Sequence, residues 1–212
     1  MADGLTLGSL SIARAGQVLV RLDAHVPPGQ VLSVMGPSGA GKSTLLSALI
    51  GTLAPGFTLS GRALMNGQDI TALPPERRHI GILFQDELLF PHLSVGGNLA
   101  FGLPASVRGR AARQARIAQA LDDIGMAGFA GRDPQTLSGG QKARVALMRV
   151  LLSQPRALLL DEPFARLDAG LRAQIRDLVF ARARAAMLPV LLVTHDPEDA
   201  HAAAGPVIRL GG

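Results

Sequence analysis

The chain has 212 residues, enough for one domain with a substantial core or for a core domain with a small inserted subdomain. Hydrophobic residues make up 48% of the chain, but no apolar run approaches the roughly 20 residues that cross a bilayer, so we expect no membrane span. The first residues lack the pattern of a signal peptide, and the absence of cysteine excludes disulfides and thiolate metal sites. We therefore expect a cytoplasmic protein whose fold relies on packing.

The net charge of +5 comes almost wholly from arginine, because Lys42 and Lys142 are the only lysines. A basic surface can attract nucleic acid or anionic lipid. The chain has no Tyr or Trp, and aromatic residues make up 3% of it, so few rings are available to stack on bases. We interpret the arginines as a solvated surface and expect no nucleic-acid partner.

Short apolar runs bounded by Gly and Pro predict several strands in the first part of the chain. The predicted strands are residues 5–12, 17–26, 31–35, 61–65 and 80–85. Residues 42–50 have the apolar spacing of a helix, which Gly51 closes. An exposed segment, residues 73–78, leads into the last of these strands.

From residue 86 to residue 155 the pattern becomes helical, with no convincing strand. The clearest predicted helices are residues 108–124 and 139–153. We therefore expect residues 86–155 to form a helical subdomain inserted into a core.

Strands return at residues 157–161 and 189–194, and a helix is predicted between them at residues 169–186. Strands that alternate with helices indicate a mostly parallel sheet. The expected fold class is α/β, in which residues 1–85 and 156–212 form a core with a mostly parallel sheet and an N-terminal antiparallel β part. Together with the helical subdomain, this core makes the whole chain a single domain.

The segment from Gly36 to Ser43 matches the phosphate-binding motif G-x-x-x-x-G-K-[ST] at every fixed position, between a predicted strand and a predicted helix. The glycines let backbone N–H groups face phosphates, and the helix adds the positive end of its dipole. Lys42 is expected to reach the β and γ phosphates of a nucleotide, and the Ser43 hydroxyl to hold Mg²⁺. The core is thus expected to be that of a P-loop (RecA-like) nucleoside triphosphatase. Its predicted nucleotide-binding residues are Gly36, Pro37, Ser38, Gly39, Ala40, Gly41, Lys42, Ser43 and Thr44.

Asp161 and Glu162 follow an apolar run, at the carboxyl end of a predicted strand, where open α/β sheets build ligand sites. We assign Asp161 to the Mg²⁺ shell, directly or through water, and Glu162 to polarising the attacking water. General-base action of this kind is typically worth about 10²–10⁴ in rate.

Ser138 precedes a predicted helix that begins Gly139-Gly140-Gln141, so one interpretation is a simple helix N-cap. Two successive glycines cost about 1 kcal/mol each in a helix, which favours free backbone N–H groups that approach an anion. We therefore predict that Ser138, Gly139, Gly140 and Gln141 form a second phosphate-binding element.

His195 follows the predicted strand at residues 189–194, again at a carboxyl end near the expected phosphates. This position favours contact with the γ-phosphate and the attacking water. Gln85 ends another predicted strand and could turn its amide to Mg²⁺ or to the same water, which spacing alone leaves undecided.

Together with Leu137 before the second phosphate element, these motifs resemble in order and spacing those of the ATP-binding cassette (ABC) ATPases. The resemblance implies that two cassettes associate head to tail. Each ATP would then lie between the phosphate loop of one cassette and the Ser138-Gly139-Gly140 element of the other. Asp168 would lie in a loop that touches the opposite subunit. Whether that subunit is an identical chain or a paralogue is left open.

Within this family, residues 73–78, 81–86 and 89–93 resemble the bacterial importers of thiamine, iron, sulfate, polyamines and similar solutes. The resemblance implies an ATP-hydrolysing subunit that drives a separate permease, which would contact about residues 86–98. It also implies a solute-binding protein in the same system and a peripheral position on the inner face of the cell membrane. Export is an alternative, because the permease sets the direction.

Two other functions explain the sequence less well. A soluble ABC ATPase that acts on nucleic acid or the ribosome generally has long coiled coils or two fused cassettes, and this chain shows neither. A P-loop kinase would leave the motif at residues 137–141 unexplained.

The sequence also departs from the family pattern. An aromatic residue usually stacks on adenine ahead of the phosphate loop, but residues 11–16 contain none, and the Arg14 guanidinium is the candidate replacement. Ala165 and Arg166 replace the usual small or hydroxyl residues before Leu167. Many relatives carry a C-terminal regulatory β domain, whereas this sequence stops at Gly212, so we expect no regulation by that route.

Overall fold

The structure is a computed structural model that describes residues 3–86 and 88–211. Its internal contacts divide the chain into two compact units. The first unit comprises Met1–Ile82, Arg156–Glu162 and Asp177–Gly212, and the second comprises Leu83–Pro155 and Pro163–Arg176. The functional division into a nucleotide-binding core and a helical subdomain stays a prediction.

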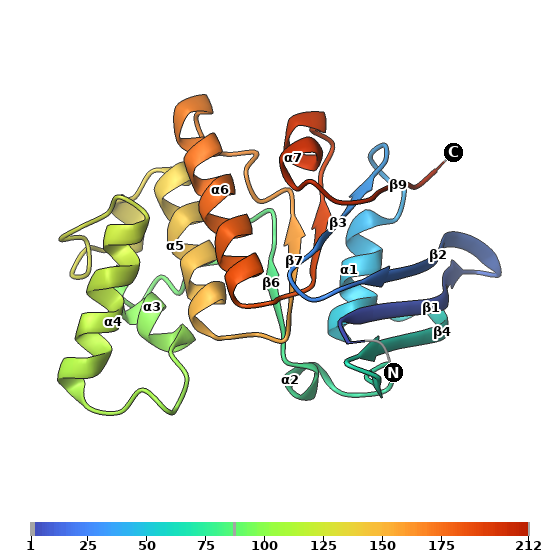
Figure 1. Ribbon diagram of the computed structural model, residues 1–212, viewed down its shortest axis with the longest axis horizontal. Coiled ribbons are helices and arrows are strands. Elements are labelled where there is room, and N and C mark those ends of the chain that lie inside the picture. The colour runs from blue at the N-terminus through green and yellow to red at the C-terminus, as the bar shows by residue number, and fades with distance from the viewer. Residues whose placement is uncertain (1–2, 87, 212) are drawn as a thin grey trace. The chain divides into compact units, whose positions relative to one another are not determined.

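An antiparallel sheet forms the N-terminal part of the first unit (Figure 1). Its strands are β1 (Leu5–Arg14), β2 (Gln17–Val26), β4 (Phe57–Met65) and β5 (Gln68–Asp69), in the order β2-β1-β4-β5. The register of β1 shifts around Ser9, whose φ of 48° marks a bulge. The bulge keeps apolar side chains of β1 on the buried face on both sides of it. These side chains are Leu5, Leu7, Leu10 and Ile12.

A five-stranded sheet completes the first unit, in the order β6-β7-β8-β3-β9. Its strands are β3 (Val31–Met35), β6 (Ile80–Leu83), β7 (Ala157–Asp161), β8 (Val190–Val193) and β9 (Val207–Arg209). Strand β3 pairs in parallel with β8 and β9, and β7 pairs in parallel with β8. Every residue of β3, β7 and β8 is buried, as expected for parallel strands covered on both faces. The carboxyl ends of these strands therefore lie along one edge of the sheet.

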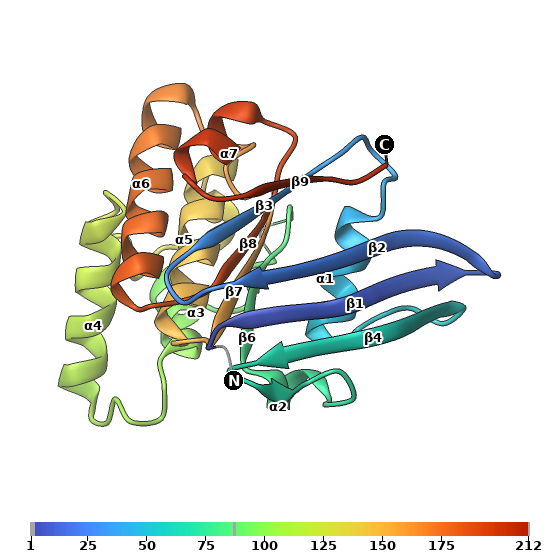
Figure 2. The same ribbon diagram turned by 45° about the vertical axis from the view of Figure 1, so that its right-hand side comes forward.

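Helix α1 (Lys42–Ile50) lies between the two sheets, where it contacts both β1 and β7 (Figures 1 and 2). Leu45, Leu46 and Leu49 of α1 are buried in one core with apolar residues of both sheets. Gly51 ends the helix at φ 85°, as its position in the sequence predicts. The predicted α/β class, with an antiparallel N-terminal part and a mostly parallel sheet, is confirmed.

The expectation that residues 73–78 are exposed is wrong at Arg78, which is 5% exposed. Helix α2 (Pro75–Arg78) turns this side chain inward. Its guanidinium donates hydrogen bonds to the carbonyl oxygens of Ala48 and Leu49 in the last turn of α1, both at 2.8 Å. It also donates to the carbonyl oxygens of Leu73 and Thr71, both at 2.7 Å. Arg78 can be buried because the four carbonyls satisfy its donors, and two of them lie at the negative end of the α1 dipole.

The second unit is built from helices. They are α3 (Val95–Gly102), α4 (Arg110–Asp123), the 3₁₀ turn η1 (Pro134–Thr136), α5 (Gly139–Leu152) and the first part of α6 (Ala169–Ala185). Helix α3 packs against both α4 and α5. As the pattern predicts, the described residues between 86 and 155 contain no strand. Within the described ranges, no helix has the length and apolar character to cross a bilayer.

Two further short elements lie near the end of the first unit. Helix α7 (Pro197–Ala202) follows β8, and Asp196 caps it by accepting a hydrogen bond from the N–H of Glu198. Strand β9 then pairs with β3 at the edge of the sheet. The sequence pattern predicted neither element, because each is shorter than the window in which periodicity is visible.

Candidate nucleotide-binding site

The phosphate loop connects β3 to α1. Gly41, the N-cap of α1, has a φ of 85°, and a Cβ at this position would lie 2.5 Å from Cγ2 of Val20. Only glycine fits this left-handed conformation and close approach. No side chain among the described residues caps α1, so its first N–H groups are available to an anion.

The loop is held in shape by its own lysine and by the edge of the sheet. Lys42 Nζ donates hydrogen bonds to the carbonyl oxygens of Gly36 and Pro37, at 2.7 and 2.8 Å. The N–H of Leu210, directly after β9, donates to the carbonyl oxygen of Met35 at 2.7 Å. A Cβ at Gly36 would lie 2.6 Å from the carbonyl oxygen of Leu210, so the loop and the end of the chain pack backbone against backbone.

Ser43 and Asp161, which the sequence assigns to Mg²⁺, meet in the structure. The Ser43 hydroxyl donates a hydrogen bond to Asp161 Oδ2 at 3.1 Å. Asp161 ends β7 and is 8% exposed. Its burial raises the pKa of its carboxyl group, and the hydrogen bond from Ser43 offsets part of that rise.

These two oxygen ligands fit a magnesium ion. Mg²⁺ prefers oxygen donors and commonly takes one or two protein ligands together with substrate phosphates. Across the described residues, no cluster of three or more His, Cys, Asp and Glu side chains forms an all-protein metal cage. The pair of Ser43 and Asp161 beside a phosphate loop therefore suits a metal that a nucleotide shares.

Glu162 and His195 also meet, because β7 and β8 are adjacent strands. Nδ1 of His195 lies 3.0 Å from Oε1 of Glu162, and the N–H of Glu162 donates to the carbonyl oxygen of Val193. The side chain of Glu162 is mostly buried, whereas that of His195 is 67% exposed. Glu162 has a φ of 48°, a conformation that is costly for a non-glycine residue and that clusters at functional sites.

In the second unit, Ser138 is a helix N-cap, as one of its two predicted roles requires. Its Oγ accepts a hydrogen bond from the N–H of Gln141 at 3.3 Å, and Gln141 Oε1 accepts one from the N–H of Ser138 at 3.0 Å. This reciprocal capping box begins α5 at Gly139 and Gly140. The second role, in which Ser138, Gly139, Gly140 and Gln141 bind phosphate, stays a prediction.

Asp168 and Gln85 also belong to the second unit. Asp168 Oδ1 accepts a hydrogen bond from the N–H of Leu171 at 3.0 Å in the first turn of α6. Strand β6 ends at Leu83 and not, as predicted, at Gln85, which lies exposed two residues further on. The predicted contact of Asp168 with an opposite subunit and of Gln85 with Mg²⁺ or water stay predictions.

The β1–β2 hairpin and the adjacent strand β4 add residues that sequence reasoning did not assign, beside Arg14, which it did assign. Val20 of β2 packs on Gly41 of the phosphate loop, while Val18 and Leu19 are 47% and 40% exposed. The guanidinium of Arg14 lies 5.1 Å from the ring centroid of Phe57, its partner in the β1–β4 ladder. No local signal could have revealed this pairing, because 43 residues separate Arg14 from Phe57 (57 − 14).

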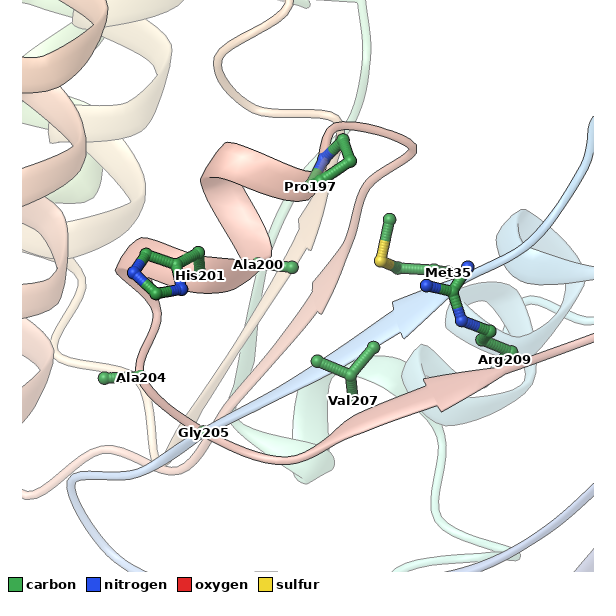
Figure 3. Close-up of a pocket in the computed structure, with 8 residues that line it drawn as sticks. All are labelled: Met35, Pro197, Ala200, His201, Ala204, Gly205, Val207 and Arg209. Carbon is green, nitrogen blue, oxygen red and sulfur yellow. The ribbon is translucent and has the colours of Figure 1, made fainter.

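A pocket of about 790 Å³ lies elsewhere, on the first unit, between α7 and the edge formed by β3 and β9 (Figure 3). His201 and Arg209 line it beside apolar side chains such as Met35 and Val207. None of the residues that line it belongs to the predicted nucleotide site.

A glycine-rich loop that opens a helix, with Ser43 bonded to an aspartate at the end of a buried strand, defines a P-loop nucleoside triphosphatase. The family model described as ABC transporter matches residues 19–165, well over half of the chain. The chain therefore belongs to the ABC transporter family, and it binds and hydrolyses ATP as a member of that family. The predicted family and enzyme class are confirmed.

Several relatives cover most of the chain. The uncharacterized ABC transporter ATP-binding protein YnjD of Escherichia coli (strain K12) is 52% identical over 183 residues, which cover 86% of this chain and 84% of YnjD. The thiamine import ATP-binding protein ThiQ of Cereibacter sphaeroides is 47% identical over 189 residues, which cover 89% of this chain and 80% of ThiQ. The spermidine/putrescine import ATP-binding protein PotA of Frankia alni is 45% identical over 188 residues, 88% of this chain but 40% of PotA.

Proposed function

We propose that this chain is the ATPase subunit of a solute importer, which hydrolyses MgATP as one half of a cassette dimer and drives a separate membrane permease. The observation that carries the proposal is the pair of contacts Ser43–Asp161 and Glu162–His195 beside the phosphate loop. The names of relatives such as ThiQ and PotA support import.

The proposed chemistry divides two adjacent carboxylates between two tasks. Asp161 and Ser43 would hold Mg²⁺, which when bound neutralises charge on the phosphates. Glu162 would accept a proton from the attacking water, and His195, through its Nδ1 contact, would orient the Glu162 carboxylate. Lys42, which now donates to loop carbonyls, would exchange these for phosphate oxygens.

The proposed active site is shared between two cassettes. Ser138, Gly139 and Gly140 of one cassette would cover the nucleotide held by the phosphate loop of the other, with Asp168 at the boundary. The glycine-rich start of α5 supports this role, because the first N–H groups of an α-helix have no partner within the helix and attract an anion.

The proposed permease contact lies in the second unit, at about residues 86–98. An exposed apolar patch supports it: Leu88 is 60% exposed, Phe101 is 68% exposed, and the half-buried ring of Phe90 lies 4.7 Å from that of Phe101. We define the docking patch as Leu88, Phe90 and Phe101. A permease bound there would place the chain on the inner face of the membrane, with a solute-binding protein on the other side.

Purification of the tagged chain from its own organism tests this function. We expect permease subunits to be recovered with the chain from detergent-solubilised membranes, and the complex to hydrolyse ATP only with Mg²⁺. Recovery of no membrane protein, together with hydrolysis that DNA or ribosomes stimulate, would instead identify a soluble ABC ATPase.

A further inference from the structure

The docking patch is held by one arginine of α5. Arg149 lies in the last turn of this helix and is half-buried. One of its terminal nitrogens donates to the carbonyl oxygen of Leu88 at 3.0 Å, and the other donates to Asn98 Oδ1 at 3.3 Å. Its guanidinium carbon lies 5.0 Å from the centroid of the Phe90 ring. A single side chain thus touches two of the three patch residues.

Asn98 also holds the backbone of the docking patch in place. This side chain is fully buried, and its Oδ1 accepts a hydrogen bond from the N–H of Phe90 at 2.8 Å. Its Nδ2 donates to the carbonyl oxygens of Phe90, Leu93 and Ser94. Asn98 therefore fixes the bend from Phe90 to Ser94, while Arg149 alone among these contacts reaches back to Leu88.

The backbone of α5 is also in direct contact with α3 at the same residue. A Cβ at Gly102 would lie 2.3 Å from the carbonyl oxygen of Arg149, so glycine is required where α3 ends against α5. Phe101, the exposed member of the docking patch, is adjacent to this contact. Both sides of the patch are therefore fixed to one turn of α5.

The other end of α5 carries the proposed phosphate-binding element. Arg149 lies 11 residues after Ser138 (149 − 138), which corresponds to about 16 Å along an α-helix. A regular helix moves as a stiff element, because the backbone groups of its interior are paired with one another within the helix. The two functional ends of the second unit are thus joined by one short, uninterrupted element.

We propose that Arg149 is a positioning residue, which fixes the docking patch to α5 so that a permease bound at the patch moves together with the Ser138 end of that helix. This inference rests on the proposed function. Arg149 itself need touch neither ATP nor the permease. Burial lowers the pKa of its guanidinium, which nevertheless stays charged at neutral pH and can keep its bonds to Leu88 and Asn98.

The first test uses a fluorescent reporter. The chain has no tryptophan, so Leu88→Trp introduces a single one at the patch. In this background we expect Arg149→Met to raise the acrylamide quenching of the tryptophan by about two-fold, because a loop without its contacts opens locally. Arg149→Lys keeps the charge but loses the planar fork, and an intermediate value is expected. Unchanged quenching in both variants would overturn the positioning role.

Arg144→Met is the matched control. Arg144 is also a partly buried arginine of α5, but it donates to the carbonyl oxygen of Ile124 at 2.6 Å, away from the patch. Its loss should leave the quenching unchanged. If quenching rose equally in Arg144→Met and Arg149→Met, the cause would be a general loosening of α5, and the proposal would be overturned.

The second test measures coupling in the whole system. The isolated Arg149→Met and Arg149→Lys variants should keep the wild-type hydrolysis rate. We expect the Met variant to recover about ten-fold less permease from membranes, as the loss of charge-assisted bonds predicts. If Arg149→Met fails to fold, Arg149→Lys is used in the same test, and a smaller loss of recovered permease is expected. Wild-type recovery of permease in both variants would overturn the docking role. Recovery of no permease with the wild-type chain would overturn the proposed function, and the docking role of Arg149 with it.

Discussion

Two neighbouring carboxylates, Asp161 and Glu162, differ in their surroundings. Asp161 is buried against the Ser43 hydroxyl, whereas Glu162 is turned by its positive φ to meet His195. Two carboxylates that lie in different environments can take different roles in one reaction. The local sequence places both carboxylates at the end of β7, but the contact with His195 depends on the pairing of β7 with β8.

Glu162→Gln should leave ATP binding intact and lower the hydrolysis rate by about 10²–10⁴, because glutamine cannot accept the proton of the attacking water. The variant should also accumulate an ATP-bound dimer. Phosphate release and size-exclusion chromatography with ATP measure the two effects. Glu76→Gln, at an exposed position of α2, is the control. Unchanged turnover in Glu162→Gln would contradict the assignment of the base.

Asp161 should make the stability of the nucleotide-free chain depend on pH. Its folded-state pKa is raised above 3.8, so the folded state binds the proton more tightly than the unfolded state does. Its contribution to stability is complete below pH 3.8 and is lost as the pH rises through the raised value. Asp161→Asn should flatten this part of the pH profile of the free energy of unfolding, measured by urea titration without Mg²⁺. If the free energy of unfolding changed with pH in the same way in the wild-type chain and in Asp161→Asn, the buried Asp161 carboxylate would have no net effect on stability.

Arg14, the candidate for the adenine contact, shows where residue-level reasoning from sequence stops. Lys42 and Ser43 are recognisable because their motif is contiguous in the chain. Arg14 was identified as a possible base contact, but the ring beside it belongs to Phe57, on another strand of the antiparallel sheet. Only the β1–β4 register brings the two together.

At the scale of elements, the helix that carries Lys42 and Ser43 is closed at its far end by Arg78. Four carbonyl oxygens, two of them in the last turn of α1, accept hydrogen bonds from this guanidinium. A buried cation is normally paired with a carboxylate, but here the carbonyls at a helix C-terminus supply the negative charge. The position of α1 thus depends on a residue 28 positions beyond its end at Ile50 (78 − 50).

Arg78→Met should lower the free energy of unfolding by about 2–4 kcal/mol, because buried carbonyls lose their donors and the helix end loses a cation. Chemical denaturation measures the change. Arg77→Met removes the neighbouring exposed arginine of α2 and should change the free energy of unfolding by less than about 0.5 kcal/mol. Similar losses in both variants would show that burial of Arg78 contributes no special stability.

Elements with a clear apolar pattern in the sequence were predictable, and elements without one were not. Helices α1 and α5 were predicted to within one residue, and β7 has the predicted bounds. Helix α3 contains Gly96, Gly97 and Gly102, which weaken any helical signal. Two of these glycines are required by tertiary contact: a Cβ at Gly96 would approach the carbonyl oxygen of Ala130, and one at Gly102 that of Arg149. Such contacts depend on tertiary packing and produce no periodic pattern in the sequence.

At the scale of the whole molecule, the proposed active site needs two chains, and mixing variants can test this. Lys42→Ala and Ser138→Arg should each abolish hydrolysis in a homodimer. Co-expressed, they form mixed dimers in which one of the two sites has both an intact phosphate loop and an intact Ser138. A random mixture should therefore recover about a quarter of the wild-type sites. ATPase activity of the purified mixture is the measurement.

Lys42→Ala mixed with Glu162→Gln is the matched control. Both residues belong to the same half of the shared site, so each site of a mixed dimer carries one defect. No activity should return. Recovery in this mixture, or its absence in the first, would contradict a site shared in the proposed arrangement.

The contact of Leu210 with the phosphate loop has a practical consequence. The final strand supports the loop from the side, through the bond from Leu210 to Met35 and the close packing on Gly36. Deleting the segment from Leu210 onward would remove that support, although none of the predicted nucleotide-binding residues would be lost. The same contact makes the Leu210 amide a natural probe, since its hydrogen should exchange with solvent more slowly once a nucleotide has stiffened the loop beside it.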